Sequence, residues 1–244
     1  MKLAVQLYSL RHHMENGENF IDILKKVKAL GFDGVEFAGF HGYSAEELKT
    51  HLDEIGLVAV GAHMGLNDFR PENLPETLRF GKTIGAKTLG IGGADTETET
   101  SLNEVIEVMG GADKKAAEEG IAVYFHNHTQ EFSEPLFNTV PGTIFERLAA
   151  ACHMQIDTYW SFHAGKDNYK LISEYKDIIP HLHIKDGIDG HPMALGEGNN
   201  DLATVVKAAK DNGIEWLILE NDDPEPDGLS DIARSMEWLK ANVN

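Results

Sequence analysis

One pattern of polar and apolar positions recurs along the chain at a spacing of about 25–40 residues. Each instance begins as a polar, amphipathic stretch, passes through a glycine and ends in a short apolar run. A helix that ends at a left-handed glycine and leads into a buried strand has this pattern. The pattern therefore predicts repeated helix–strand units. Five phrases carry it, KKVKALGFDGVEF, LKTHLDEIGLVAVGAH, LRFGKTIGAKTLGIGG, DKKAAEEGIAVYFHNH and VKAAKDNGIEWLILE, with Gly31, Gly56, Gly85, Gly120 and Gly213 at the joint.

Three more segments bring the expected strands to eight. FERLAAACHMQIDTYW and YKDIIPHLHIKD keep the rhythm without the glycine, and Pro180 ends the helix in the second of them. The opening LAVQLYSL supplies the first strand. Continuous apolar runs such as LVAV and WLIL are typical of parallel strands that helices cover on both faces.

Eight alternating units without a linker predict one α/β domain over residues 1–244, a (β/α)8 TIM barrel. A doubly wound sheet of eight strands is the competing interpretation. We favour the barrel because no GxGxxG motif follows the first strand. A chain of 244 residues with 42% hydrophobic content can bury one core without disulfide bonds.

The sequence shows no sign of export or of membrane insertion. Its single cysteine, Cys152, cannot form an internal disulfide, and the apolar stretch near the N-terminus is too short for a secretory signal. No segment approaches the roughly 18–20 uninterrupted apolar residues of a membrane helix. We therefore expect a cytoplasmic protein that does not span a membrane.

The net charge narrows the choice of partner. The chain has 40 acidic and 21 basic side chains, and its formal net charge of −19 repels phosphate backbones and anionic lipids. No cluster of Lys and Arg offers a basic face. Nucleic acid is therefore not expected as a partner, although a class of DNA-repair endonucleases shares this barrel. A small molecule is the expected ligand, and a homo-oligomer is left open.

Titratable side chains gather where the expected strands end, which is where TIM barrels carry their catalytic groups. In HLHIKD the period-two alternation puts His183 and Lys185 on one face, toward the barrel axis, and Leu182 and Ile184 on the other. The polar residues at the strand ends are Gln6, Glu36, His63, His126, Asn127, His128, Glu131, Asp157, His183, Lys185, Asp186 and Glu220.

Carboxylates and imidazoles confined to one site need a cation between them. Mixed oxygen and nitrogen ligands suit Mn²⁺, Co²⁺, Mg²⁺ or Zn²⁺. Taken singly, each residue is equally well explained as a helix cap or a hydrogen-bonded buried histidine. Their convergence from separate strands favours one divalent metal ion.

Eight phrases distributed along nearly the whole chain resemble those of one family. They are VQLYSLR, LGFDGVEF, VGAHMGL, FHNHTQEF, IDTYW, HLHIKD, LGEGNND and LILEND. They are similar to phrases of the xylose isomerase-like TIM barrels called sugar phosphate isomerases/epimerases, a group that includes tagatose epimerases, inosose dehydratases and hydroxypyruvate isomerases. The resemblance implies a metal ion held by Glu131, Asp157, His183 and Glu220.

Strand five departs from the pattern of many relatives. They carry the first metal carboxylate on that strand, where this chain has His126. The subgroup with an HNH phrase offers a glutamate a few residues later, here Glu131. His126 or His128 could ligate instead. Alternatively, both histidines and Asn127 hydrogen-bond sugar hydroxyls or the ligating carboxylates.

The resemblance and the site imply a metal-dependent isomerase or epimerase that acts on a sugar, keto-sugar or cyclitol. A metal chelated by a carbonyl and a neighbouring hydroxyl acidifies the α C–H bond and stabilises the resulting enediolate. The resemblance assigns proton transfer to Glu131 and Glu220. Lys185 is placed to stabilise the oxyanion, or else it pairs with Asp186 or Glu220. Substrate contacts are expected from Gln6, His63, His126, Asn127, His128 and Glu197.

Two other functions fit the same sequence. A lyase of the inosose dehydratase type eliminates water after the same proton abstraction, and a non-catalytic protein would only bind the sugar. Phosphate is not expected in the substrate, because no glycine-rich anion cradle follows strands seven and eight and Glu197 of LGEG would repel it.

Overall fold

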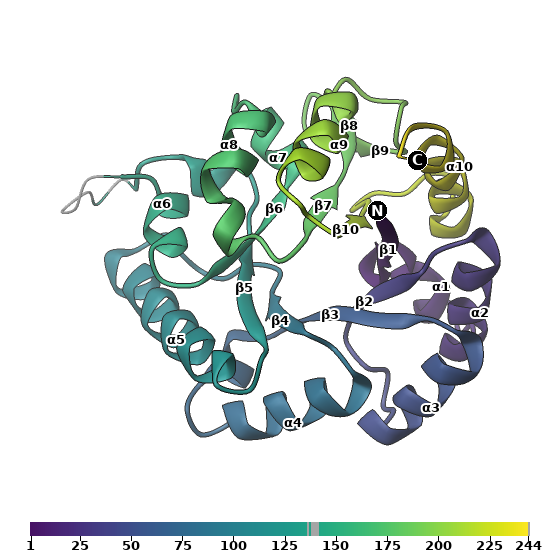
Figure 1. Cartoon of the computed structure of the whole chain (residues 1–244), viewed down its shortest axis with the longest axis horizontal. Helices are drawn as coiled ribbons and strands as arrows, with labels where there is room; N and C mark the ends of the chain where they lie inside the picture. Colours follow the sequence, from purple (N-terminus) through teal and green to yellow (C-terminus); the bar gives the residue numbers. More distant parts are fainter. Residues whose placement is uncertain (136, 138–141, 244) are drawn as a thin grey trace.

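The computed structural model describes residues 1–135, 137 and 142–243. Its eight parallel barrel strands close in the order β1-β10-β7-β6-β5-β4-β3-β2, and helices surround them (Figure 1). This architecture confirms the predicted (β/α)8 TIM barrel. The barrel strands are β1 (Lys2–Gln6), β2 (Gly34–Ala38), β3 (Val58–Met64), β4 (Thr88–Ile91), β5 (Ala122–His126), β6 (His153–Asp157), β7 (Leu182–Ile184) and β10 (Trp216–Leu219).

The helices begin and end where the local sequence supplies caps. Ser44 and Thr143 accept a hydrogen bond from the third backbone N–H of their helices, which satisfies a donor that the helix leaves free. All five glycines predicted at the joints have a positive φ, between 71° and 109°. Within the described ranges, no helix is long and apolar enough to cross a bilayer.

The connecting segments contain α-helices and short 3-10 turns. The α-helices are α1 (Arg11–Glu15), α2 (Phe20–Leu30), α3 (Ala45–Ile55), α4 (Leu74–Ile84), α5 (Glu99–Ala117), α6 (Ile144–Ala149), α7 (Thr158–His163), α8 (Asn168–Tyr175), α9 (Leu202–Asp211) and α10 (Gly228–Asn242). The 3-10 turns are η1 (Leu7–Leu10), η2 (Leu66–Phe69), η3 (Gln130–Phe132) and η4 (Lys176–Ile178).

Alternation along the strands separates two apolar layers. Val5 and Leu217 belong to the large core between the strands and the helices, where full burial of such a side chain stabilises the fold by about 1.5–3 kcal/mol. Ala4, Val60 and Ile218 form a separate small cluster from the opposite strand faces. Beyond this cluster, toward the C-terminal ends of the strands, the barrel interior becomes polar.

Tyr124 fills the middle of the barrel because the neighbouring strand has no side chain there. Its partner across the ladder is Gly90 of β4. A Cβ atom on Gly90 would lie 2.4 Å from the Tyr124 ring and from its backbone oxygen. Only glycine therefore leaves room for this tyrosine.

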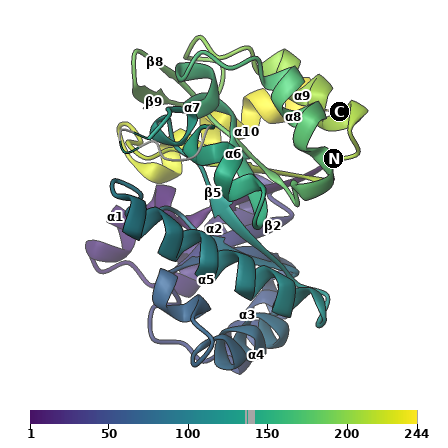
Figure 2. The same cartoon turned by 90° about the vertical axis from the view of Figure 1, so that its left-hand side faces the viewer.

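A further pair of strands was not predicted. After β7 the chain forms an antiparallel hairpin, β8 (Asp186–Ile188) and β9 (His191–Met193), outside the barrel. Its two turn residues, Asp189 and Gly190, have φ of 51° and 86°, as a type I′ turn requires. The hairpin lies on the α10 side of the molecule, away from α3 and α4 (Figures 1 and 2).

Candidate functional site

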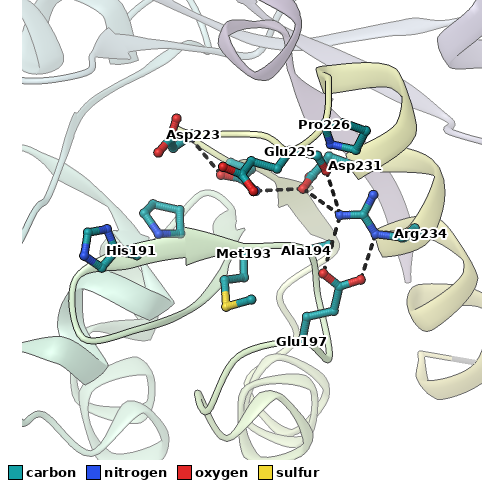
Figure 3. Close-up of a pocket in the computed structure, with 11 residues that line it drawn as sticks. His191, Met193, Ala194, Glu197, Asp223, Glu225, Pro226, Asp231 and Arg234 are labelled. Atoms are coloured by element: carbon teal, nitrogen blue, oxygen red, sulfur yellow. Dashed lines mark hydrogen bonds and ion pairs between the residues drawn. The ribbon is translucent and has the colours of Figure 1, made fainter.

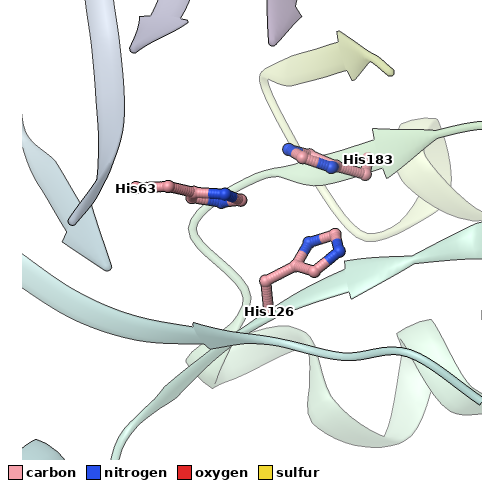
Figure 4. Close-up of side chains that lie close together, drawn as sticks. All are labelled: His63, His126 and His183. Atoms are coloured by element: carbon pink, nitrogen blue, oxygen red, sulfur yellow. The ribbon is translucent and has the colours of Figure 1, made fainter. Parts of the chain in front are cut away.

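Four side chains with metal-ligating atoms converge at the C-terminal end of the barrel. His126 ends β5, Asp157 ends β6, His183 lies in β7 and Glu220 follows β10, so four neighbouring strands contribute. One ligand-type atom of each lies within 4.8 Å of the other three. None of the four residues is more than 4% exposed. His63 forms a second such group with His126 and His183, and Figure 4 shows the three rings close together.

His183 is held between two carboxylates. Its Nε2 lies 2.6 Å from Glu36 Oε2, and its Nδ1 lies 3.0 Å from Glu220 Oε2. Burial alone would lower the pKa of His183, but the charges of Glu220 and Glu36 raise this pKa to about 10. Both ring nitrogens therefore carry a proton near neutral pH. A metal ion that took Nδ1 would displace one proton and leave Nε2–H donated to Glu36, the usual way to orient a ligating histidine.

His126 is neutral by contrast. Burial, followed by the nearby charge of His183, holds the pKa of His126 well below its usual value. Its Nδ1 lies 2.9 Å from Gln155 Oε1, and an amide oxygen only accepts, so we assign the proton to Nδ1. The free electron pair on Nε2 then faces Asp157 Oδ2 and Glu220 Oε2, each 3.9 Å away. This nitrogen is available to a metal ion.

Glu36 anchors a polar layer directly beneath the group. Its Oε1 accepts hydrogen bonds from Tyr124 Oη at 2.5 Å and Gln155 Nε2 at 2.7 Å, and its Oε2 accepts one from Gln6 Nε2 at 2.7 Å. Burial raises the pKa of Glu36, but His63 and His183 more than offset this and hold the pKa well below its usual value. Gln6, a predicted substrate contact, is therefore buried beneath the site.

Asp157 presents to the group one oxygen that accepts no hydrogen bond from the described residues. Its Oδ1 accepts hydrogen bonds from the backbone N–H groups of Tyr159 and Trp160 and so caps α7. Its Oδ2 is buried and has no hydrogen-bond partner among the described residues, although Lys185 Nζ lies 2.9 Å away. Burial raises the pKa of Asp157 despite the charge of Lys185. A buried carboxylate oxygen that lacks a hydrogen bond and lies beside imidazole nitrogens fits a divalent cation.

A pocket of about 660 Å³ opens above these residues, within the range that small-molecule sites occupy. His126 and Glu220 form part of its wall. Two buried nitrogens of lining residues, His128 Nδ1 and Trp160 Nε1, have no described hydrogen-bond partner. No described lining residue is Lys or Arg; the lining comprises Tyr8, Ala38, His63, Met64, Gly92, His126, His128, Trp160, Glu220 and Asp222.

Two residues of the HNHTQE segment support the site from outside the group. Glu131 is buried; its Oε2 accepts a hydrogen bond from the His128 backbone N–H at 2.7 Å, and its Oε1 has no described partner. Burial raises the pKa of Glu131. Asn127 Oδ1 accepts a hydrogen bond from the Asp157 backbone N–H at 3.1 Å. The structure therefore groups His126, and not Glu131, with the other three predicted ligands.

Glu197 lies away from this pocket. It pairs with Arg234 of α10, at 2.7 Å between Oε1 and Nε, and lines a separate pocket of about 510 Å³ beside the β8–β9 hairpin (Figure 3). Asp186 accepts four backbone hydrogen bonds, three of them from residues 196, 198 and 200, and so shapes the loop after the hairpin. Asp186 and Glu220 were the two expected partners of Lys185. The structure places Lys185 Nζ 2.8 Å from Glu220 Oε2, whereas Asp186 is occupied by the backbone of this loop.

Several residues of the site were not predicted from the sequence. Tyr124 and Gln155 lie two positions before His126 and Asp157, and Asp222 lies two positions after Glu220. The period-two alternation of a strand identifies Tyr124 and Gln155, whereas Asp222 lies beyond the end of β10. Trp160 follows a strand end without such a pattern.

A sequence model of the family described as xylose isomerase-like TIM barrel matches residues 24–242. A solved sugar phosphate isomerase/epimerase from Parabacteroides distasonis superposes with a TM-score of 0.80 at 20% identity, over 98% of this chain and 97% of that one. A probable 3-DHS dehydratase from Bacillus anthracis gives 0.76 at 15% identity over 100% of both chains. The 3-keto-D-glucoside 4-epimerase of E. coli gives 0.69 at 18% identity over 99% of both.

These structural likenesses show the fold alone, because the identities are low. A local match to lipoyl synthase of Histophilus somni is 40% identical over 50 residues, 20% of this chain and only 15% of that protein's length. The family model, by contrast, spans almost the whole barrel. The chain therefore belongs to the xylose isomerase-like TIM barrel family.

Proposed function

We propose that the chain is a metal-dependent isomerase or epimerase that moves a proton next to the carbonyl group of a sugar, keto-sugar or cyclitol. The observation that supports this most is the buried group of two imidazoles and two carboxylates, whose ligand-type atoms lie within 4.8 Å of one another. It borders a pocket of suitable size. Such a site can bind a metal ion and a polar substrate side by side.

His126, Asp157, His183 and Glu220 would hold the cation, and Mn²⁺, Co²⁺, Mg²⁺ and Zn²⁺ all accept such ligands. When bound, the ion would polarise the substrate carbonyl and so acidify the neighbouring C–H bond. Glu131 remains the alternative ligand from the segment after β5.

Glu131 and Glu220 are our candidates for proton transfer. The raised pKa of Glu131 and its buried Oε1, which has no described hydrogen-bond partner, suit a group that takes up and returns a proton. Glu220 is held ionised: burial opposes its charge, but Lys185 and His183 keep its pKa well below the usual value. Lys185 would stabilise the negative charge that develops on the substrate oxygen.

The pocket favours a neutral substrate. Glu220 and Asp222 line it, no described lining residue is cationic, and Lys185 is already paired with carboxylates. The carboxylates of Glu220 and Asp222 would repel a phosphate group. His63, His128 and Trp160 instead offer ring nitrogens to which sugar hydroxyls can hydrogen-bond.

The relatives' names agree with this class of reaction. One structural neighbour is called a sugar phosphate isomerase/epimerase and another a 3-keto-D-glucoside 4-epimerase. A third is a probable 3-DHS dehydratase, which keeps a lyase as the second candidate.

Solvent exchange tests the proposal. Metal-reconstituted protein in D₂O would be incubated with ketoses, 3-keto-glucosides and inososes and followed by NMR. We expect deuterium to be incorporated at the carbon next to the carbonyl of one substrate, without elimination of water from that substrate. Exchange with loss of water would identify a lyase instead. Binding without exchange would leave only a sugar-binding protein and contradict the proposal. Protein treated with a chelator is the control.

A further inference from the structure

Three carboxylates surround the ammonium group of Lys185, which is fully buried. Its Nζ donates hydrogen bonds to Asp222 Oδ2 at 2.7 Å and Glu220 Oε2 at 2.8 Å. It also lies 2.9 Å from Asp157 Oδ2, without the geometry of a hydrogen bond. The centroid of the Trp160 ring, part of the pocket wall, is 5.4 Å from this nitrogen.

Two of these three carboxylates have a second role. Asp157 and Glu220 belong to the group that would hold the metal ion, and the same two oxygens that face Lys185 also face His126 Nε2. A divalent cation and an ammonium group in contact with the same oxygens repel each other strongly in a buried site. We therefore expect metal binding to displace the ammonium group of Lys185 from these two oxygens.

We propose that Asp222 is the positioning residue that keeps the ammonium group of Lys185 paired when a divalent cation takes Asp157 and Glu220. The inference rests on the metal site of the proposed function. Asp222 lies outside the group of ligating atoms but within contact distance of Lys185. It thereby holds the ammonium group at the pocket wall, where a substrate oxygen can reach it.

The surroundings of Asp222 suit this role. Its side chain is 29% exposed, so water can share in solvating the pair after Lys185 shifts toward it. Its backbone oxygen accepts a hydrogen bond from Arg11 Nη2 at 2.6 Å, and the Asn221 backbone N–H donates to Ser9 Oγ at 3.0 Å. These bonds fix the backbone from which Asp222 reaches Lys185. Without Asp222, a retreating Lys185 would become a buried, unpaired charge.

Titration of Mn²⁺ into the metal-free protein tests the inference. We expect Asp222→Asn to weaken Mn²⁺ binding by roughly 10–100-fold, the range seen when residues that support metal ligands are lost. Lys185→Met removes the competing ammonium, so the same Asp222→Asn change should have almost no effect in that background. A merely structural role of Asp222 would persist in both backgrounds.

Asp223→Asn is the matched control. It removes the same charge from the same loop, but Asp223 is exposed and lines the pocket beside the β8–β9 hairpin. It should leave Mn²⁺ affinity within about twofold of wild type. Circular dichroism and thermal unfolding check that each variant folds. If Lys185→Met does not fold, Lys185→Gln takes its place. The inference about Asp222 would be overturned if Asp222→Asn bound Mn²⁺ as tightly as the wild type, or if it lost as much Mn²⁺ affinity in the Lys185→Met background as in the wild type. Neither result would contradict the metal site itself. Absence of Mn²⁺ binding by the wild type would overturn the metal site as well.

Discussion

Glu36 Oε2 and His183 Nε2 lie 2.6 Å apart at the centre of the barrel, although 147 positions separate the two residues in the chain. Glu36 also receives hydrogen bonds from Gln6, Tyr124 and Gln155. Four strands thus converge on one ionised carboxylate, and this carboxylate fixes the ring that would ligate the metal. The relationship makes Glu36 part of the site without making it a ligand.

Glu36→Gln should therefore affect both stability and metal binding. Removing one charge of a buried pair costs about 3–5 kcal/mol, so we expect a loss of this size in the free energy of unfolding of the metal-free protein, measured by urea denaturation. The affinity for Mn²⁺ should fall by roughly 10–100-fold. An unchanged affinity would show that the orientation of His183 does not depend on Glu36.

Metal binding should release a proton from His183. Its pKa in the folded protein is about 10, above the ordinary value of 6.5. Its contribution to stability is complete below pH 6.5 and is lost as the pH rises through about 10, and metal affinity should rise over the same interval. Calorimetry at about pH 8, in buffers of different ionisation enthalpy, should detect about one proton released per ion bound. No released proton would mean that His183 is not a ligand.

The choice between His126 and Glu131 has a direct test. We expect His126→Asn to weaken Mn²⁺ binding more than Glu131→Gln does, because His126 Nε2 faces the other ligands while Glu131 Oε2 is bound to the His128 backbone. Both substitutions preserve most of the side-chain volume. The reverse order of affinities would identify Glu131 as the ligand.

Gly90→Ala tests the packing that supports the polar layer. The added Cβ would lie 2.4 Å from Tyr124, and such overpacking typically costs about 1–3 kcal/mol. Gly111→Ala, in α5 with nothing within 4 Å of the new atom, should instead stabilise the protein by roughly 0.5–1 kcal/mol. Thermal unfolding of both variants compares them. Equal unfolding temperatures of the two variants would contradict the close approach of Tyr124 to Gly90.

Most of the fold could be predicted because each step depends on local sequence. The glycines at the joints need a positive φ whatever surrounds them, and the alternation in HLHIKD alone turns His183 and Lys185 inward. The β8–β9 hairpin was missed although its Asp189–Gly190 turn is a local signal too.

The site was predicted less completely, because part of it depends on how loops turn. Asp157 and His183 are paired directly by strand register, and Glu220 follows the last residue of β10. Glu131 follows the end of β5 by several residues, and its direction is set by a hydrogen bond to the His128 backbone that spacing does not reveal. Glu197 was likewise expected at the substrate pocket because of its LGEG motif, but in the structure its side chain pairs with Arg234 of α10.

Counting the metal ions bound to metal-free protein, by calorimetry with Mn²⁺ and by elemental analysis after desalting, tests the central claim most directly. We predict one ion per chain for the wild type and strongly weakened binding for Asp157→Asn, which keeps the Oδ1 acceptor that caps α7 but loses the charge. A stoichiometry near zero with Mn²⁺, Co²⁺, Mg²⁺ and Zn²⁺, or full binding by Asp157→Asn, would contradict the account.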